Sequence, residues 1–591
     1  MKLYSYNRRK IYFTCIAIVM TAVFLMGRLA YLMVAKADYY NRAATGLHER
    51  ERSIKAPRGR IYDRNGNILA DNKAVCSVSV IHSQIEDEEA VIQVLNEYLD
   101  KGEAEIRKKV TKVSSRELIA TNVAKETGDQ IRELNVAGIK VDEDYKRYYP
   151  YGSLASKVLG FTGADNQGIV GLEVWYNEIL AGEDGSIHTV TDAKGIELPN
   201  VKETRVSPVP GDDLVLSLDL TIQKYATQAA LSVMEEKQAK RVAMIIMNPQ
   251  NGEIYAMVDV PEYDLNQPFQ LNMDLAGYES VADGEKMDAL NNMWRNFTVS
   301  DTYEPGSTFK IVTATAALEA GTVSLSDTFY CPGYKIVEDR RIRCHKTTGH
   351  GSEDFRHALM NSCNPAFMTI GERTGATNLY QTYQKLGLFQ KTGIDLPGEA
   401  NSIMHKLSDI GPVELATMSF GQSFQISPIQ FVTAAATVIN GGNKITPHIG
   451  MKVVDAESQV MTELQYPVTQ GAVGSETSAT MRDLLESVVA EGGGSKAQIE
   501  GYRIGGKTAT SEKYPRGTGK YISSFLGFAP ANDPQVMAFV MIDEPTGVYY
   551  GGTIAAPVIQ EVFSNILPYL GIPKEENYLI REEKYSHFKM K

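Results

Sequence analysis

The sequence lacks the features of several common classes of protein. Its 591 residues include only five cysteines, which excludes a scaffold held together by disulfides. Basic residues are not in excess, because the formal net charge is -12, whereas a nucleic-acid-binding protein normally presents a basic face. No H-E-x-x-H motif and no repeat with a period of about 20–50 residues occur, so neither a common zinc protease nor a solenoid is expected. The composition predicts an acidic globular protein of several domains that does not bind nucleic acid.

One long apolar run is present, near the N-terminus. Residues 11–27 carry no charge over 17 positions, and the apolar pattern resumes after Arg28 as far as Ala35. A run of this length can span the hydrocarbon core of a membrane as a helix. The residues before it include four basic ones and no acidic one, and the positive-inside rule keeps such a flank in the cytoplasm: Lys2, Arg8, Arg9 and Lys10. We therefore expect a cytoplasmic tail (1–10), a transmembrane anchor (11–35) and an extracytoplasmic ectodomain.

A cleaved signal peptide is the alternative to a retained anchor. Ala35-Lys36-Ala37 has the A-x-A pattern of a cleavage site. The apolar stretch is, however, longer than the core of a usual signal peptide, and Arg28 interrupts the approach to that site. These features favour a single-pass membrane protein.

Beyond the anchor, the pattern predicts two α+β domains. Asn65-Gly66 between two extended runs indicates a hairpin. Residues 84–135 are rich in charge, with helical periodicity at 88–98 and 117–134, which predicts an inserted helical lobe. The Pro- and Gly-rich segment Arg205–Asp213 indicates a domain boundary. We predict a first domain with this lobe, a second domain of strands and helices, and a short tail: residues 36–213, 214–571 and 572–591.

The first candidate for chemistry is Ser307-Thr308-Phe309-Lys310. Pro305-Gly306 permits a sharp entry, and the apolar residues 311–318 predict a buried helix. Ser307 then lies at the helix N-terminus, with Lys310 one turn further on the same face. A desolvated lysine there can act as a base for the serine hydroxyl, while the helix N-terminus favours developing negative charge. The spacing S-x-x-K is a weak signal by itself, because it also occurs by chance.

Two further motifs follow in order. Ser362-Cys363-Asn364 begins 55 residues after Ser307, and Lys507-Thr508-Ala509-Thr510 begins 145 residues after Ser362. S-x-x-K, an S-x-N type motif and K-T-G in this order are typical of penicillin-binding proteins and class A β-lactamases. The sequence therefore resembles this family.

Other segments narrow the resemblance to class B penicillin-binding proteins, the monofunctional peptidoglycan transpeptidases. Residues 58–66 (RGRIYDRNG) resemble the R-G-x-I-x-D-R-x-G motif of their pedestal, and Gly171-Leu172-Glu173 within residues 168–195 resembles a later part of it. Residues 419–422 (SFGQ) and 427–430 (SPIQ) resemble a loop and a helix of the catalytic domain. The resemblance implies an α+β fold with an N-terminal transmembrane helix, an elongated β-rich pedestal of the dimerisation type, and a C-terminal transpeptidase domain. That last domain is expected to be an antiparallel sheet flanked by helices, plus an all-helical subdomain.

The resemblance also implies roles for individual residues. Three match the acylated nucleophile, its base and the proton relay to the leaving D-alanine: Ser307, Lys310 and Ser362. Four match groups that hold the substrate's amide side, its terminal carboxylate and the oxyanion: Asn364, Lys507, Thr508 and Thr510. No metal or other cofactor is implied.

The implied activity is serine-type D-Ala-D-Ala transpeptidation, in which a stem peptide acylates Ser307, D-alanine leaves, and an amine of a neighbouring strand takes the acyl group. β-Lactams would inhibit it by acylating the same serine. The implied partners are peptidoglycan stem peptides, a polytopic SEDS-type glycosyltransferase in the membrane, and other proteins of division or elongation. The pedestal segments favour the division and sporulation branch over the elongation branch.

Ala509 departs from the family pattern, in which the third motif ends in glycine. A methyl group there limits how closely another chain approaches this strand. Ala509 therefore leaves open a catalytically weak or silent scaffold of the wall-synthesis complex. A β-lactam sensor or β-lactamase on the same fold is a second alternative. Residues 501–508 also fit the letters of a P-loop, but residues 510–519 contain too many turn formers for the helix that a P-loop requires.

Cys331 and Cys344 leave three possibilities open. They lie 13 residues apart in a polar segment, with His345 and His350 close by. A disulfide is reasonable outside the membrane. Two cysteines and two histidines also suit zinc, although the spacing fits no standard pattern. Two unpaired thiols are the third possibility.

Overall fold

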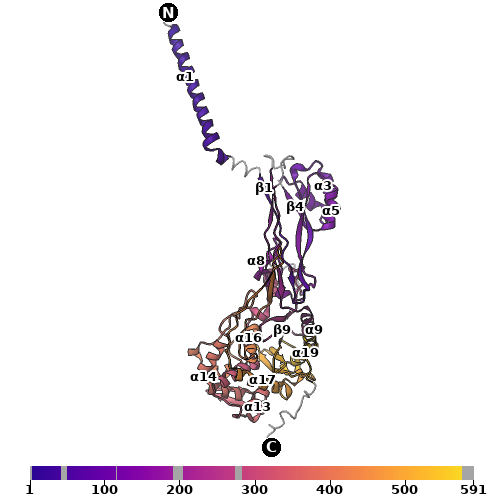
Figure 1. Cartoon of the computed structure of the whole chain (residues 1–591), viewed down its shortest axis with the longest axis vertical. Helices are drawn as coiled ribbons and strands as arrows, with labels where there is room; N and C mark the ends of the chain where they lie inside the picture. Colours follow the sequence, from indigo (N-terminus) through magenta and orange to yellow (C-terminus); the bar gives the residue numbers. More distant parts are fainter. Residues whose placement is uncertain (1–2, 41–48, 115, 191–203, 273–282, 576–591) are drawn as a thin grey trace. The chain divides into compact units, whose positions relative to one another are not determined.

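The computed structural model describes residues 3–40, 49–114, 116–190, 204–272 and 283–575 (Figure 1). Lys2, part of the segment after the anchor, Gly195 and most of the predicted C-terminal tail lie outside these residues. The chain has a mixed α+β fold, and its contacts divide it into two units: residues 1–57, 73–146 and 182–209 in the first, and residues 58–72, 147–181 and 210–591 in the second. The domain limits expected from the sequence stay a prediction.

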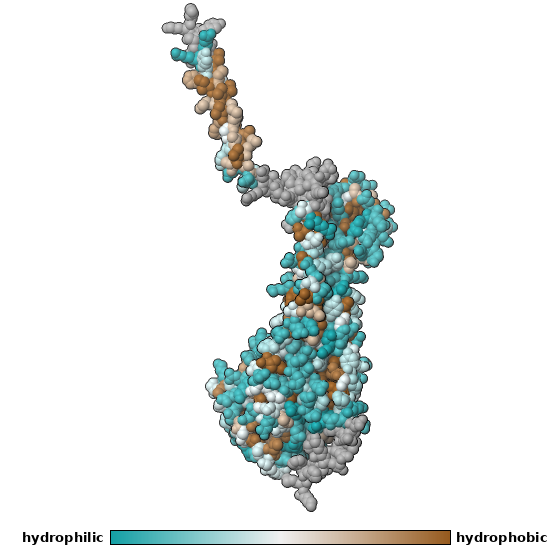
Figure 2. Space-filling model, in the orientation of Figure 1, coloured by the Kyte–Doolittle hydropathy of each residue, from teal (hydrophilic) through white to brown (hydrophobic). Residues whose placement is uncertain are grey.

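The apolar run near the N-terminus forms one long helix. α1 (Leu3–Ala30) continues into a π-helical turn (Tyr31–Ala35), and residues 8–35 are long and apolar enough to cross a membrane. Figure 2 shows hydrophobic residues gathered along this helix. None of its apolar window is buried against the rest of the chain. A helix that is apolar and unpacked in this way is suited to lipid.

The first unit contains a small sheet-and-helix lobe and a separate antiparallel sheet. In the lobe, β4 and β5 both pair with β3, and three helices cover them: β3 (Ile68–Val80), β4 (Glu117–Ala124), β5 (Ile139–Tyr148), α3 (Glu88–Tyr98), α4 (Glu103–Val110) and α5 (Lys125–Glu133). Val91, Leu95 and Ile106 are fully buried in its core. The separate sheet has the order β1-β6-β7: β1 (Glu49–Ile54), β6 (Gly185–Val190) and β7 (Thr204–Val206).

Of the two helices predicted in this lobe, one is confirmed and the other is wrong over its first half. Residues 88–98 form α3 with the predicted limits. Residues 117–134 were expected to be helical throughout, but residues 117–124 form strand β4 and only Lys125–Glu133 are helical. Pairing with β3 buries Ile119 and Ala120, so the contacts of the sheet outweigh the local helical spacing.

The second unit is built on a five-stranded antiparallel sheet. Its order is β10-β9-β19-β18-β17, so β17 lies on an edge: β10 (Ile254–Val260), β9 (Arg241–Met247), β19 (Val536–Asp543), β18 (Tyr521–Ala529) and β17 (Gly505–Glu512). Helices cover both faces. α9 and α19 pack on one face and α12, α16 and α17 on the other: α9 (Leu220–Lys237), α19 (Ala556–Tyr569), α12 (Lys310–Glu319), α16 (Pro428–Ile439) and α17 (Ser475–Ala490).

The alternation of side chains along β9 shows how the two faces are filled. Val242, Met244 and Ile246 pack with α9 and α19, whereas Ala243 and Ile245 pack with the helices of the other face. Because both faces are buried, the strand is an unbroken apolar run in the sequence. Such runs predict strands at residues 242–247, 521–528 and 535–543, and β9, β18 and β19 lie there with limits that agree to within one residue.

A mostly helical region follows α12 and completes this side of the unit. It contains three helices and two short antiparallel pairs, β11 with β14 and β12 with β13: α13 (Phe355–Met360), α14 (Asn364–Lys385), α15 (Pro412–Met418), β11 (Thr328–Cys331), β14 (Gly351–Asp354), β12 (Tyr334–Val337) and β13 (Arg340–Arg343). α14 is a long helix that the sequence pattern did not indicate. Cys363 is its N-cap and Pro365 lies in its first turn, where proline is tolerated.

A smaller sheet of the second unit holds the RGRIYDRNG segment. β2 pairs with the start of β3 through the predicted turn at Asn65-Gly66, and with β8, which pairs with β15 and then β16: β2 (Ile61–Tyr62), β8 (Asp213–Leu216), β15 (Gly450–Val454) and β16 (Met461–Glu463). Short helices lie beside it, including α7 (Gly171–Trp175) and α8 (Asn177–Leu180). Arg58 is 1% exposed and donates to the Glu173 carboxylate at 2.6 Å, so the two segments that carried the pedestal resemblance meet in one buried ion pair.

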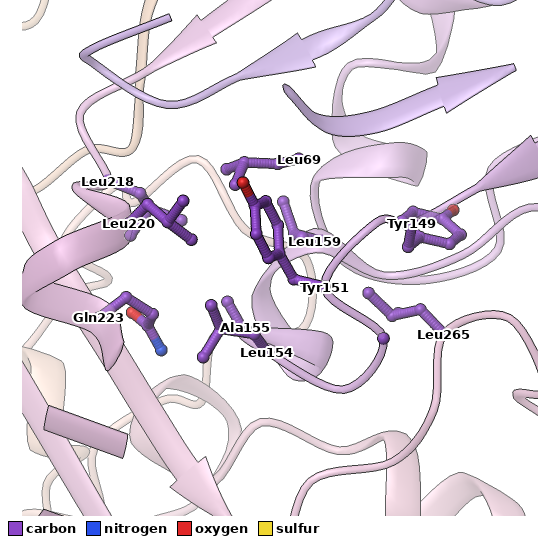
Figure 3. Close-up of a pocket in the computed structure, with 11 residues that line it drawn as sticks. Leu69, Tyr149, Tyr151, Leu154, Ala155, Leu159, Leu218, Leu220, Gln223 and Leu265 are labelled. Carbon is purple, nitrogen blue, oxygen red and sulfur yellow. The ribbon is translucent and has the colours of Figure 1, made fainter. Parts of the chain in front are cut away.

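An apolar pocket lies next to this sheet, between α9 and the residues after β5 (Figure 3). Its walls are mainly leucines and two tyrosines, including Leu69, Leu159, Leu220 and Tyr149. None of its lining residues belongs to the three short motifs. The chemistry predicted from those motifs must therefore be sought elsewhere in the unit.

Candidate active site

The first motif lies on a tight turn that is held by a second loop. Residues Gly306–Phe309 form a 3-10 turn that runs into α12. The Gly306 N–H donates to the Gly421 carbonyl oxygen at 2.8 Å. A Cβ atom added at Gly421, whose φ is +84°, would lie 2.1 Å from the Gly306 carbonyl oxygen. The SFGQ segment needs a glycine here because its backbone touches the turn that carries Ser307.

The packing around this turn leaves Ser307 partly accessible. The Phe309 ring is fully buried and contacts the rings of Tyr383 and Phe424, with centroids 5.2 and 4.6 Å away. The Thr308 hydroxyl donates to the Pro305 carbonyl at 2.8 Å. Ser307 is half-buried, whereas the three other residues of the turn are buried. A rigid turn thus carries one reachable hydroxyl.

Lys310 joins the first motif to the second. Its side chain is fully buried, and Nζ donates to the Ser362 carbonyl oxygen at 2.6 Å, to Ser362 Oγ at 3.1 Å and to Asn364 Oδ1 at 2.8 Å. It also lies 5.3 Å from the centre of the Phe367 ring. The lysine is therefore fixed in position by polar groups that come from the start of α14.

Ser362 has an uncommon backbone conformation. Its φ is +52°, in the left-handed region that non-glycine residues seldom adopt. Backbone hydrogen bonds after α13 hold it there: the Ser362 N–H donates to Leu359 and the Cys363 N–H to Ala358, at 3.1 and 2.9 Å. Such conformations persist where the surroundings over-determine them, and they concentrate at functional sites.

Lys507 brings the third motif to the same hydroxyl. It lies on the edge strand β17 and is fully buried, and its Nζ donates to Ser362 Oγ at 2.9 Å and to the Thr508 carbonyl at 3.1 Å. Ser362 Oγ therefore accepts from two lysines that are 197 residues apart in the sequence. All three motifs meet at this oxygen.

The two amines are buried without a carboxylate beside them. Among the described residues, no carboxylate lies within 4 Å of Lys310 Nζ or Lys507 Nζ. Burial lowers the pKa of Lys310 to about 8. Burial, followed by repulsion from Lys310, lowers the pKa of Lys507 well below its usual value. Neutral amines are thereby favoured, and a neutral amine can accept a proton.

Alternation along β17 separates the other residues of the third motif. Lys507 is paired with Leu526 and Thr508 with Phe525, and these two partners face opposite sides of the sheet. Thr508 and Thr510 thus lie on the face opposite Lys507, and Thr510 Oγ1 accepts from the Gly551 N–H at 3.0 Å.

Ala509 shares the Lys507 face and is only 3% exposed. A Cβ atom added at Gly306 would lie 3.7 Å from its methyl carbon. The methyl group therefore fills space between β17 and the turn of Ser307. The P-loop letters at residues 501–508 are accidental, because β17 begins inside them and runs on as a strand.

The structure brings most of the expected site residues together. Lys310, Ser362, Asn364 and Lys507 are joined by hydrogen bonds, and Ser307 lies one turn before Lys310. Thr508 and Thr510 follow Lys507 on the same edge strand, with their side chains directed to the other face. Arg516 forms an ion pair with Glu304 at 2.6 Å, and this links the segment after β17 to the residues before Ser307. No local sequence pattern could indicate this pair.

Comparisons with known proteins agree with this arrangement. Residues 242–564 match the family model described as the penicillin binding protein transpeptidase domain, and residues 53–216 match the penicillin-binding protein dimerisation domain. Stage V sporulation protein D of Bacillus subtilis is 38% identical over 98% of this chain and 88% of its own length. Peptidoglycan D,D-transpeptidase FtsI of Escherichia coli is 28% identical over 94% of this chain and 91% of its own length.

A solved structure shows the same fold. The crystal structure of penicillin binding protein 2X from Streptococcus thermophilus superposes with a TM-score of 0.72, covers 87% of this chain and 80% of its own, and is 21% identical. The transpeptidase match alone spans more than half of the chain, and it contains all three motifs that meet at Ser362. The chain therefore belongs to the penicillin-binding proteins, as a class B member of the division and sporulation type.

Proposed function

We propose that this chain is a peptidoglycan D,D-transpeptidase in which Ser307 is the nucleophile and Lys310 its base. The observation that supports this most directly is the shared hydroxyl of Ser362, which accepts from Lys310 at 3.1 Å and from Lys507 at 2.9 Å. A serine, two buried amines and a relay hydroxyl in one place are the groups that acyl transfer requires.

The first half of the reaction forms an acyl-enzyme. Neutral Lys310 takes the proton of Ser307 while Ser307 Oγ forms a bond to the carbonyl carbon between the two D-alanines. The oxyanion is stabilised by the backbone N–H groups of Ser307 and Thr510, a contribution of about 3 kcal/mol per donor in other enzymes. When the C–N bond breaks, Ser362 passes a proton to the nitrogen of the leaving D-alanine and is reprotonated from Lys310.

The second half runs through the same groups in reverse. An amine of a neighbouring peptidoglycan strand gives up a proton towards Ser362 and Lys310 and attacks the acyl carbon. The bond to Ser307 Oγ then breaks, and the serine recovers its proton. A β-lactam enters by the first half only, because its ring nitrogen stays tethered to the acyl group after the ring opens.

The substrate is held along the edge of the sheet. β17 has no strand on its outer side within the described part of the sheet, so its backbone can pair with an extended peptide. Entry of the terminal carboxylate next to Lys507 favours the charged form of that amine. We propose that Asn364 holds the amide side of the donor. Lys507 and Thr508 lie on opposite faces of β17, and we propose that they hold the carboxylate from the two sides of this edge strand.

A silent scaffold is the less favoured function. That alternative rested on Ala509, whose methyl could have occupied the space of the substrate. The methyl is buried beside Gly306, and Lys507 still reaches Ser362. The lysine network is intact, and this favours an active enzyme.

The chain is anchored in the membrane, and we propose that its N-terminus is cytoplasmic. The support is the basic group Arg8, Arg9 and Lys10 at the start of an apolar helix. Protease digestion of spheroplasts should remove the ectodomain and spare an N-terminal tag. Loss of the tag would reverse the proposed orientation.

Neither matched domain is a polymerase. We therefore also propose that the glycan strands come from a SEDS-type glycosyltransferase, bound with other divisome proteins.

Fluorescent penicillin tests the nucleophile. Full-length protein in detergent should take up one label per chain, and Ser307→Ala should take up none while keeping the thermal midpoint of the wild type. Ser324→Ala, an exposed serine in the loop after α12, is the matched control and should label normally. Labelling that persists in Ser307→Ala would assign the nucleophile to another residue.

A further inference from the structure

A second cluster of chemically active side chains lies beside the active site. It consists of three thiols and one imidazole: Cys331 at the end of β11, Cys344 directly after β13, His350 directly before β14, and Cys363 at the N-cap of α14. One ligand atom from each lies within 4.8 Å of all the others. The sequence pattern suggested only a pair of these cysteines, with His345 and His350 as neighbours. In the fold, Cys363 completes the group of four. The exposed His345 has its Nδ1 3.8 Å from Cys344 Sγ but does not belong to that group.

The geometry of the cluster fits a tetrahedral metal ion. Zinc binds sulfur at about 2.3 Å and imidazole nitrogen at about 2.0–2.1 Å, so tetrahedral ligand atoms lie about 3.5–3.8 Å apart. Cys344 Sγ and His350 Nδ1 are 3.7 Å apart. The widest pair in the cluster exceeds the tetrahedral separation by only about 1 Å. Small side-chain rotations are enough to close the four groups around one ion.

Burial and polarity distinguish this cluster from ordinary buried cysteines. The three thiols are 0–2% exposed and free. Isolated buried cysteines act as small apolar residues. Here, however, the His350 side chain, 6% exposed, lies against Cys344 Sγ, and the Glu353 side chain, 4% exposed, lies against His350. An apolar filling of the core would not place an imidazole and a carboxylate there.

Glu353 supplies an independent indication. One carboxylate oxygen, Oε2, accepts from the Asn361 side chain at 2.9 Å. The other, Oε1, is buried, has no hydrogen-bond partner among the described residues, and lies 3.9 Å from His350 Nδ1. Nδ1 is also the nitrogen that faces Cys344 Sγ, so this oxygen lies against the cluster itself, where a buried carboxylate oxygen without a partner requires a cation or a proton donor.

We propose that Cys331, Cys344, His350 and Cys363 bind one zinc ion in a closed tetrahedral site, with Glu353 beside the histidine. Three cysteines and one histidine are a set found in structural zinc sites, and thiolates select soft metals over Mg²⁺ or Ca²⁺. Four protein ligands leave no open position for a water molecule. The ion is therefore structural, and it takes no part in the acyl transfer itself.

The site has a consequence for the second motif. Cys363 lies between Ser362 and Asn364, the two residues that bind Lys310. The metal ties this segment to the β11/β14 and β12/β13 pairs, and the Asn364 side chain also donates to the Arg343 carbonyl, next to Cys344, at 3.3 Å. Zinc thus positions Ser362 in its left-handed conformation. This part of the inference rests on the proposed function, whereas the metal site itself does not.

The metal content of the protein tests whether these four residues bind zinc. Full-length protein in detergent, equilibrated with ZnCl₂ and freed of excess metal by gel filtration, should retain one zinc per chain by mass spectrometry. Cys344→Ser and His350→Ala should lose most of it. His345→Ala and Cys15→Ser are the matched controls and should keep it, and His350→Cys should keep it because cysteine is also a zinc ligand.

Three results would overturn the site. They are less than about a tenth of a zinc per wild-type chain, a Cys331–Cys344 disulfide in the isolated protein, and full zinc retention in both Cys344→Ser and His350→Ala. Thiol alkylation of the wild type adds a measurement that does not depend on whether a variant folds. In the wild type, Cys331, Cys344 and Cys363 should react only after a strong chelator is added, and reaction at the same rate without chelator would contradict metal binding.

Penicillin acylation tests the positioning role. Removal of zinc should slow acylation at least tenfold, and zinc should restore it. If zinc-loaded wild type binds one metal and is never acylated, the proposed function fails and the metal site stands. If the metal-free protein is acylated at the wild-type rate, zinc has no positioning role.

Discussion

Two groups of buried charged side chains in the second unit show opposite solutions to the cost of burial. In the first, the Glu173 carboxylate lies between Arg58 and Arg147, with N–O distances of 2.6 and 2.7 Å. All three side chains are at most 2% exposed. In the second, Lys310 and Lys507 are equally buried, but they share one neutral hydroxyl and no carboxylate. Burial is the same, and only the partners differ.

The partners decide what each group can do. Burial alone would raise the pKa of Glu173, but the charges of Arg147 and Arg58 outweigh it and lower that pKa. The carboxylate therefore stays ionised and serves the structure. Burial of Lys310, by contrast, is opposed by no ion pair and lowers its pKa to about 8. A group that changes protonation near neutral pH is suited to proton transfer.

The largest effect is expected from breaking the first group. Glu173→Gln keeps the shape of the side chain but leaves two buried guanidinium groups without a counter-charge. Removing one partner of a buried ion pair typically costs about 3–5 kcal/mol. The thermal midpoint should fall accordingly, while the acylation rate per folded molecule should not change.

Glu178→Gln is the control for this variant, because Glu178 is exposed on the adjacent helix α8. Its midpoint should match the wild type. A Glu173→Gln protein as stable as the wild type would show that the arginines find other partners or water. The ion pairs of Glu173 would then not stabilise the fold.

The second prediction removes the ability of the Lys310 side chain to act as a base. Lys310→Arg retains a cation of similar length that cannot lose its proton at working pH. Loss of a general base slows a reaction by about 10²–10⁴-fold, so penicillin acylation per folded molecule should slow at least 10²-fold. The thermal midpoint should also fall, because a permanent cation is then buried without a counter-charge. Stopped-flow acylation measures it. Wild-type rates in this variant would assign the base to another group.

The third prediction uses pH in place of mutation. Lys310 must be neutral to accept the proton of Ser307, and its pKa is lowered to about 8. The acylation rate of the wild type should therefore rise as pH rises from 6 towards 8 and level off above it. The rate at pH 7 should be about tenfold below the plateau, since one pH unit below the pKa leaves about a tenth of the amine neutral. A flat profile over this range would mean that the base is neutral for another reason.

The parts that could be predicted from the sequence are those set by local patterns. Residues 311–318 are apolar and follow Pro305-Gly306, so the turn and helix α12 could be expected. The apolar runs of β9, β18 and β19 likewise indicated their strands. The order of the three motifs carried the resemblance to the family, and the family model over residues 242–564 confirmed it.

The parts that could not be predicted depend on contacts between distant segments. Residues 117–124 have helical spacing but form β4, because pairing with β3 buries Ile119. The meeting of Lys310 and Lys507 at Ser362 depends on the edge position of β17 and on its contact with the turn that starts at Gly306. No spacing rule joins Cys363 to Cys331 and Cys344, because the chain between them runs through two strand pairs. The orientation of Ala509 needed the register of β17 against β18.

The smallest effect concerns Ala509, the residue where the chain departs from its family. Its methyl shares the face of Lys507 but lies against Gly306, with only 3% of the residue exposed. Ala509→Gly therefore opens no space for a substrate. It adds freedom to the unfolded chain, which lowers stability by about 0.5–1 kcal/mol. Penicillin acylation should stay within about twofold of the wild type, a difference of about 0.4 kcal/mol. Ala509→Val is the matched opposite change, and it should slow acylation because the turn of Ser307 has no room to withdraw from β17. A rate increase of tenfold or more in Ala509→Gly would place the methyl in the substrate's path.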